Sequence, residues 1–311
     1  MTTVSLPDAI RNFVTVSPEQ PDEQLLALDS SFMQDLYKEH GAILFRGFPL
    51  DFEIFRQITA RLCFNSIFNN SPGRQIVDKK RNIQTVNLGD EAFPLHPELS
   101  REPWKPDACW FACMLPPKSG GETTICDGVE VVRKMTKTAR EGFMTQRLRY
   151  VQPVTPKECQ YWFGSDAPAD ETLDNPPANC PFRFSRQDNM ILRSFTRPAL
   201  HRPMFSEEPA FGNFLLFARY GRNNKTFPTF ADGSMVSDEL VEEVKRISDA
   251  LTVAIRWQKN DLVLLDNTRF MHGRNRIENV HERLILSYFG YLKFAERNPE
   301  DPPNAPWRIS V

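Results

Sequence analysis

The stretch ACWFACML, residues 108–115, is an apolar run with the length of a buried β-strand, and Pro116 and Pro117 close it. Four further runs, apolar or alternating, are also predicted to be strands: 148–154, 212–221, 261–267 and 283–292. Long connecting segments separate these strands, and the regular strand–helix alternation of a doubly wound parallel sheet is absent. This pattern favours a mainly β fold built as a two-sheet sandwich or barrel with flanking helices packed outside.

Helical patterns surround this strand-rich part of the chain. The predicted helices are 24–39, 51–62, 128–144 and 237–253, and two earlier strands are predicted at 42–48 and 83–89. No shift in composition marks a boundary, so we expect residues 1–311 to form a single domain. The segment at about 155–200 is predicted to be a lid or an insertion, because its first thirty or so residues show no periodicity.

The charge balance gives no reason to expect nucleic acid or an anionic membrane as a partner, since 38 basic residues face 40 acidic ones. No run approaches the ~20 apolar residues that span a bilayer, and the first residues, MTTVSLPDAIRNF, lack the features of a signal peptide. We therefore expect a cytoplasmic protein whose six cysteines are mostly buried thiols. Cys109 and Cys113 have a CxxxC spacing, which is weaker evidence for zinc or redox chemistry than a CxxC pair.

The five histidines separate into two groups. His40, His201 and His281 are flanked by charged residues or proline and are expected to be structural or exposed, with a place in the active-site lining as the alternative for His201. His96 opens the sequence His-Pro-Glu, and in an extended segment His96 and Glu98 project from the same face. His272 follows the predicted strand 261–267. Two histidines and one carboxylate are the ligands of non-haem Fe(II) sites, and zinc accepts the same set; an HxE pair alone also occurs on many protein surfaces.

The surroundings of these residues make the pattern more specific. The segment 95–127, LHPELSREPWKPDACWFACMLPPKSGGETTICD, and the segment 261–292, DLVLLDNTRFMHGRNRIENVHERLILSYFGYL, resemble the two metal motifs of the taurine dioxygenase/clavaminate synthase-like superfamily. In that superfamily the first motif contains an HxD/E, a strand, a Pro-Pro turn and a Gly-Gly-Asp/Glu-Thr sequence. The second motif contains a DN-x4-HGR sequence followed by an arginine. The resemblance covers most of the chain and is weakest over 155–200.

The resemblance implies a double-stranded β-helix, or jelly-roll, core and an oxygenase that uses Fe(II), 2-oxoglutarate and O2. It assigns His96, Glu98 and His272 to the iron. It assigns Arg283 and Thr123 to the distal carboxylate of 2-oxoglutarate. A guanidinium and a hydroxyl suit that group, because they donate charge-assisted hydrogen bonds.

Neighbouring residues leave alternatives open. Arg274 either helps to hold the cosubstrate or pairs with an acid such as Asp266. Asp266 and Asn267 are candidates to orient His272 through its second nitrogen. Candidate substrate contacts, each more readily structural, are Gln84, Asn87 and Arg219.

Two positions narrow the reaction that the resemblance implies. Halogenases of the superfamily replace the carboxylate ligand with a small residue, so Glu98 argues against halogenation. Ser287 stands where the taurine enzymes carry an arginine for the sulfonate, which argues against taurine. We expect hydroxylation, desaturation or cyclisation of a small molecule in specialised metabolism, an amino acid or its derivative, free or carrier-bound. The competing hypotheses are a catalytically silent 2-oxoglutarate or metal sensor and a zinc hydrolase on the same ligands.

Overall fold

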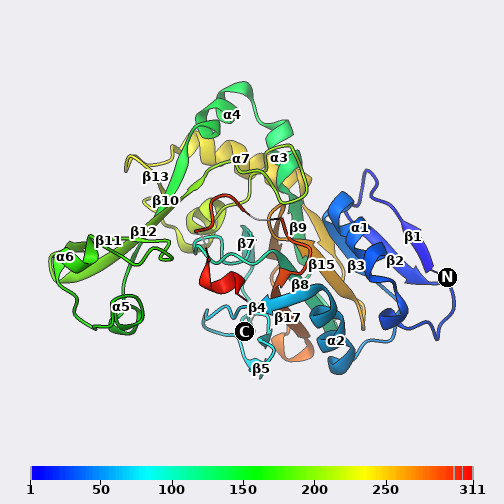
Figure 1. Ribbon diagram of the computed structural model, residues 1–311. Helices are drawn as coiled ribbons and strands as arrows, with labels where there is room; N and C mark the ends of the chain where they lie inside the picture. Colours follow the sequence, from blue (N-terminus) through cyan, green and yellow to red (C-terminus); the bar gives the residue numbers. More distant parts are fainter. Residues whose placement is uncertain (1, 297, 303, 310–311) are drawn as a thin grey trace.

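The computed structural model describes all residues except 1, 297, 303, 310 and 311. Its largest sheet (Figure 1) has nine strands, all antiparallel to their neighbours except for the parallel pair β2 and β3. In spatial order the strands are β1 (Thr2–Ser5), β2 (Val14–Pro18), β3 (Ala42–Phe45), β15 (Leu262–Asp266), β8 (Ala108–Leu115), β17 (Leu284–Leu292), β6 (Ile83–Thr85) and β5 (Ile76–Asp78), with β4 (Cys63–Ser66) also paired to β17.

A second, four-stranded sheet packs against the first. Its order is β14 (Val253–Ile255), β9 (Thr123–Asp127), β16 (Phe270–Arg274) and β7 (Phe93–His96). Ile125, Ile255 and Phe270 from this sheet share one buried cluster with Phe111 and Phe289 from the large sheet. The two open, facing sheets form the jelly-roll core, so the prediction of a mainly β fold with this core is confirmed.

The strand β8 explains why the run 108–115 is apolar throughout. Cys109 and Phe111 point into the space between the two sheets. Trp110 and Ala112 point to the opposite face, which is covered by α1 (Ser30–His40) and α2 (Phe52–Leu62). A strand that is buried on both faces does not alternate in polarity. All six cysteines are free thiols, as expected, and Cys109 is buried with Phe111.

Two predicted helices differ most from the observed ones, and in each a side chain caps the first turn of a helix that begins inside the predicted range. The helix predicted at 24–39 begins at Ser30, because Asp29 accepts a hydrogen bond from the Ser31 backbone N–H; a 3-10 turn, Leu25–Ala27, precedes it. The helix predicted at 128–144 is broken into α3 (Gly128–Lys134) and α4 (Lys137–Met144), and Thr136 caps the second. The helix predicted at 237–253 is α7 (Asp238–Leu251), and the Ser237 side chain caps its start.

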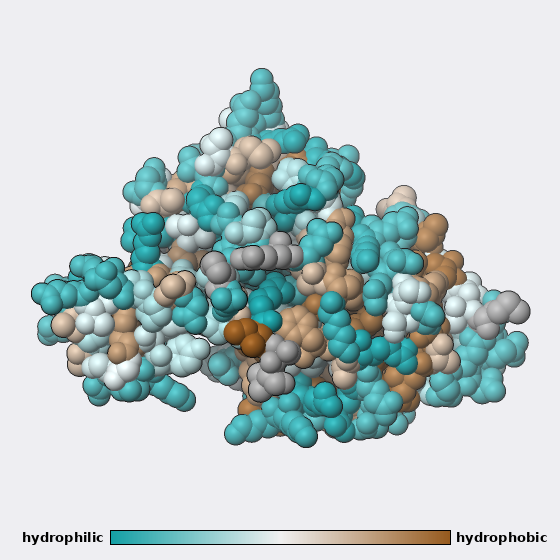
Figure 2. All heavy atoms as spheres, viewed as in Figure 1, coloured by the Kyte–Doolittle hydropathy of each residue, from teal (hydrophilic) through white to brown (hydrophobic). Residues whose placement is uncertain are grey.

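Residues 155–200 hold more regular structure than their sequence suggests. They contain α5 (Pro156–Phe163), α6 (Asp170–Leu173), β11 (Arg183–Gln187) and β12 (Met190–Pro198). The last two strands form a third sheet, in the order β11, β12, β10 (Arg147–Pro153), β13 (Thr229–Phe230). Figure 1 shows this part projecting from the body, and Figure 2 shows its visible face to be mostly hydrophilic. Whether it acts as a lid stays a prediction.

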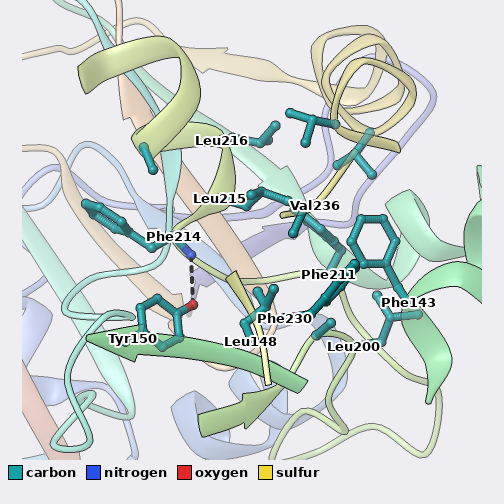
Figure 3. Close-up of a cluster of buried hydrophobic side chains, with 14 of the residues drawn as sticks. Phe143, Leu148, Tyr150, Leu200, Phe211, Phe214, Leu215, Leu216, Phe230 and Val236 are labelled. Atoms are coloured by element: carbon teal, nitrogen blue, oxygen red, sulfur yellow. Dashed lines mark hydrogen bonds between the residues drawn. The ribbon is translucent and has the colours of Figure 1, made fainter. Parts of the chain in front are cut away.

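The strand predicted over 212–221 is wrong, because this segment is helical. Leu215–Arg222 form a helix whose part Phe217–Gly221 is a π-helix. The side chain of Asn213 accepts a hydrogen bond from the Leu215 backbone N–H and so starts the helix. Phe214 and Leu215 then pack into the cluster in Figure 3, where the Phe214 N–H donates to the Tyr150 hydroxyl at 3.5 Å. A short apolar run does not distinguish a buried helix from a strand.

Other strands are shorter than predicted: 42–48 ends at Phe45 and 83–89 ends at Thr85. The chain also contains short 3-10 segments at Val280–Glu282 and Pro306–Arg308. Within the described residues, no helix has both the length and the apolar character that a membrane crossing requires.

Candidate metal centre

Three side chains that are far apart in sequence converge on the small sheet. His96 ends β7 and is paired directly with His272 of β16, and Glu98 follows in the turn after β7. Residues directly opposite in an antiparallel pair project from the same face. One ligand atom each from His96, Glu98 and His272 therefore lie within 4.8 Å of one another.

The histidine ligand atoms are oriented by neighbouring groups. The His96 Nδ1 lies 2.8 Å from the Pro94 carbonyl oxygen, which can only accept, so Nδ1 carries the proton and Nε2 keeps its lone pair. The Phe217 ring lies 4.7 Å from the His96 ring, and the Phe111 ring lies 5.2 Å from the His272 ring, between ring centres. Burial, together with His272, lowers the pKa of His96 to about 3. This imidazole is therefore neutral at neutral pH, which is the form that binds metals.

The carboxylate of Glu98 is fully buried and only half satisfied. Its Oε1 accepts a hydrogen bond from the Asn69 amide. Its Oε2 has no hydrogen-bond donor among the described residues and lies 3.5 Å from both His272 Nε2 and Arg74 Nη2. Burial raises the pKa of Glu98, but Arg74 and His272 outweigh it and hold the pKa at about 2. A buried, ionised oxygen beside two imidazoles fits a divalent cation, which would compensate its charge.

The turn that carries Glu98 is held by Asn267 at the end of β15. The Asn267 Oδ1 accepts a hydrogen bond from the Glu98 backbone N–H at 2.7 Å, and its Nδ2 donates to the carbonyls of Glu98 at 3.1 Å and Pro106 at 2.8 Å. The structure does not give Asn267 and Asp266 the expected role of orienting His272. Asp266 instead accepts from the backbone and hydroxyl of Thr268, and closes the turn into β16.

A pocket opens over these three side chains. Its apolar wall is formed by Val86, Phe93, Leu99, Phe111, Phe214 and Phe217. No residue of the segment 155–200 is part of the described lining. The helix that follows Asn213 supplies the wall instead, through Phe217 and Arg222.

Thr123 and Arg283 line the same pocket, and each has hydrogen-bonding capacity that the protein leaves unused. The Thr123 hydroxyl accepts a hydrogen bond from Trp257 Nε1 at 3.2 Å, which leaves its proton free to point elsewhere. Arg283 is 8% exposed as a residue, and its Nε has no partner among the described residues. Gly121 makes room for it, since a Cβ there would lie 3.4 Å from Arg283 Cδ and Nε and 2.9 Å from Ile277. A buried guanidinium without an acid matches a carboxylate ligand.

Arg274 also lines the pocket, but its donors are occupied. It donates to the backbone carbonyls of Asn87, Gly89 and Glu91, and its guanidinium lies 4.7 Å from the centre of the Phe93 ring. The alternative in which it pairs with Asp266 is therefore wrong. Its cosubstrate role stays a prediction that these contacts do not favour.

The other candidates from sequence have structural partners. Gln84 bonds the backbone of Asn69, Asn87 donates to the Pro72 carbonyl, and Arg219 bonds Asp238. His201 donates to the Thr268 carbonyl at 2.6 Å, in agreement with a structural role.

Sequence reasoning missed Arg74, Asn69, Trp257 and Phe217. The first two lie in the segment 64–82, for which the sequence predicts no helix or strand. Nothing in the local pattern of that loop indicates that it folds back onto Glu98. Phe217 was hidden by the wrong strand prediction at 212–221.

The chain is similar to proteins of one family along most of its length. The model of the family described as taurine catabolism dioxygenase TauD, TfdA family matches residues 9–288. A clavaminate synthase-like protein of Arabidopsis thaliana is 24% identical over 277 residues, covering 81% of this chain and 82% of the relative. The dapdiamide synthesis protein DdaC of Enterobacter agglomerans is 22% identical over 304 residues, covering 86% and 88%.

Solved structures show the same fold. PvcB of Pseudomonas aeruginosa, an Fe, alpha-ketoglutarate dependent oxygenase from an isonitrile synthetic pathway, superimposes with a TM-score of 0.61. It is 16% identical, and the match covers 96% of this chain and 94% of PvcB. With the family match over residues 9–288, these findings identify the chain as a member of the TauD/TfdA family and as a dioxygenase that depends on Fe(II), 2-oxoglutarate and O2.

Proposed function

We propose that His96, Glu98 and His272 hold the iron, that Thr123 and Arg283 hold the distal carboxylate of 2-oxoglutarate, and that the substrate is an amino acid or a compound derived from one. The observation that carries the proposal is the convergence of the three ligand atoms within 4.8 Å in the pocket that Thr123 and Arg283 also line. A two-histidine, one-carboxylate set leaves coordination positions open for a cosubstrate.

When bound, Fe(II), 2-oxoglutarate and O2 supply oxidation of an unactivated C–H bond, coupled to conversion of 2-oxoglutarate into succinate and CO2. The residues of the chain bind the metal and the cosubstrate, orient them, and exclude water from the site. The His96 tautomer is fixed by the Pro94 carbonyl, and the Glu98 turn by Asn267. Trp257 fixes the Thr123 hydroxyl so that it can donate to a carboxylate. The apolar wall of the pocket shields the reacting carbon of the substrate from water.

The substrate class is supported by the kind of protein that the chain resembles. DdaC is described by its role in dapdiamide synthesis and PvcB by its place in an isonitrile synthetic pathway, so both act in small-molecule biosynthesis. The carboxylate ligand Glu98 is retained, which favours oxygenation over halogenation. Hydroxylation is the proposed outcome, and desaturation or cyclisation needs only a different substrate position.

The test is succinate formation from 2-oxoglutarate with Fe(II), ascorbate and air, in the presence of a panel of amino acids. We expect succinate formation that is stimulated by at least one amino acid and abolished by His96→Ala. Arg283→Ala should mainly raise the KM for 2-oxoglutarate, because it removes a charge-assisted contact to the cosubstrate.

The same assay separates the competing hypotheses. A silent sensor would bind 2-oxoglutarate without forming succinate, and a zinc hydrolase would be active with Zn²⁺ and indifferent to 2-oxoglutarate. Failure to bind 2-oxoglutarate, combined with no turnover on any compound, would overturn the proposed function.

A further inference from the structure

The pocket holds more positive charge than its own acid can neutralise. Glu98 is the one acidic side chain in the lining that the structure describes, whereas five arginines line it: Arg74, Arg101, Arg222, Arg274 and Arg283. Arg274 is engaged by backbone carbonyls and Arg283 is assigned to the cosubstrate. Of the remaining three, Arg74 is the one that touches the metal centre.

The guanidinium of Arg74 is largely shielded from solvent but incompletely paired. Its side chain is 11% exposed, and Nη2 lies 3.5 Å from Glu98 Oε2. Nη1 donates to the Ser287 hydroxyl at 3.2 Å, and the guanidinium carbon lies 5.2 Å from the centre of the Phe289 ring. Its Nε has no hydrogen-bond partner among the residues described. Once Glu98 serves a metal, Arg74 keeps an uncompensated charge and free donors beside that metal.

The backbone on either side of Arg74 is fixed by hydrogen bonds, and the side chain itself is held by Ser287 and Glu98. The Gly73 carbonyl accepts a hydrogen bond from the Leu88 N–H at 2.8 Å. The Gln75 N–H donates to the Thr85 hydroxyl at 2.9 Å, and the Gln75 carbonyl accepts from the Thr85 N–H at 2.8 Å. A side chain held in this way loses little freedom when it binds a ligand.

We propose that Arg74 binds a free carboxylate of the organic substrate, and this rests on the proposed function of the same site. Arg74 comes from the loop before β5 and lies against Ser287 of β17, which has no charge. Arg74 therefore supplies the positive charge at this place in the pocket. Since Arg74 adjoins Glu98, the carboxylate lies beside the metal, and the oxidised carbon is close to it in the substrate. The rings of Phe214 and Phe217, 5.1 Å apart between centres, receive an apolar or aromatic side chain.

The proposal decides between two substrate forms. A carrier-bound amino acid is a thioester and has lost the carboxylate that Arg74 would bind. The geometry therefore favours the free acid, or an N-modified acid that keeps its carboxylate.

The test measures binding to the complete Fe(II)–2-oxoglutarate complex without O2, by isothermal titration calorimetry. The probes are leucine, phenylalanine and tyrosine, free and N-formylated, each with its primary amide. We expect at least one acid to bind wild-type enzyme about tenfold or more tightly than its amide, the usual size of a charge-assisted contact. Arg74→Gln should bring the acid to within about twofold of the amide, and Arg74→Lys should lie between.

Two controls separate this inference from the proposed function. Arg81→Gln removes an exposed arginine outside the pocket and should keep the wild-type preference for the acid. Affinity for 2-oxoglutarate should change less than about twofold in Arg74→Lys, whereas loss of 2-oxoglutarate binding by wild-type enzyme would concern the proposed function. If Arg74→Gln does not fold, Arg74→Lys carries the test. An acid-to-amide ratio that is unchanged in the folded variants, or no acid in the panel that binds wild-type enzyme, would overturn the role of Arg74.

Discussion

Replacing Asn267 with alanine should weaken both the fold and the metal centre. Asn267 is 1% exposed and makes three hydrogen bonds to the turn that carries Glu98 and to Pro106. The substitution leaves the Glu98 N–H and two carbonyls without partners in a buried place. At about 1–3 kcal/mol for each unsatisfied group, and with partial relief by entering water, we expect a loss of about 3–5 kcal/mol. That is a large part of a typical stability of about 5–15 kcal/mol.

The loss of the same bonds should also lower Fe(II) affinity by about 10–100-fold, because groups that orient a ligand affect metal binding at this level. Urea denaturation of the metal-free protein measures the first effect, and Fe(II) competition against a chelator measures the second. The matched control is Asp261→Ala at the other end of β15. Asp261 is fully buried and paired with Arg46, so its loss should cost about 3–5 kcal/mol without changing metal affinity.

The comparison of the two variants can refute the reasoning. If Asn267→Ala is destabilised yet binds Fe(II) as wild-type protein does, Asn267 does not position the ligand. If both variants lose metal affinity equally, the effect follows from general destabilisation.

Three further predictions concern the proposed cosubstrate contacts and Asp266, the buried acid that closes the turn into β16. Trp257→Phe should raise the KM for 2-oxoglutarate by about 3–10-fold, because it frees the Thr123 hydroxyl to rotate; an unchanged KM in initial-rate assays would count against this contact. Gly121→Ala should weaken 2-oxoglutarate binding and lower stability by about 1 kcal/mol or more, since φ is +70° and the new Cβ presses on Ile277 and Arg283; calorimetry showing wild-type affinity would contradict it. Burial raises the pKa of Asp266 from 3.8 to about 6, so the folded protein keeps this proton to a higher pH than the unfolded chain does. Above pH 6, ionisation of Asp266 therefore lowers the free energy of unfolding by up to about 3 kcal/mol. Asp266→Asn should therefore gain stability relative to wild type as the pH rises from 4 to 7, and a difference that is constant across urea melts at these pH values would argue against a raised pKa.

The core strands and the candidate metal ligands could be predicted because their signals are local. The run 108–115 is apolar on both faces, since it is the strand β8 between a helix layer and the small sheet. His96 and Glu98 are close in sequence, and the sequence around His272 resembles a motif. These features need no knowledge of the chain's path through space.

The rest of the site depends on contacts that sequence periodicity does not encode. Arg74 reaches Glu98 because residues 73–75 bond residues 85–88, in a segment with no regular pattern. Asn267 was correctly singled out but given the wrong partner, since the turn places its amide against Glu98 rather than His272. Residues 215–222 form a helix because Asn213 caps its start and its apolar side chains are buried against the neighbouring sheet; this burial is a tertiary effect.

A crystal structure with Mn(II) and N-oxalylglycine, an oxygen-stable analogue of 2-oxoglutarate, tests the central claim most directly. We predict one manganese peak in the anomalous difference map, bound by His96 Nε2, His272 Nε2 and a Glu98 carboxylate oxygen. The distal carboxylate of the analogue should contact Thr123 and Arg283. A metal bound elsewhere, or an analogue whose distal carboxylate lies on other residues, would contradict the account.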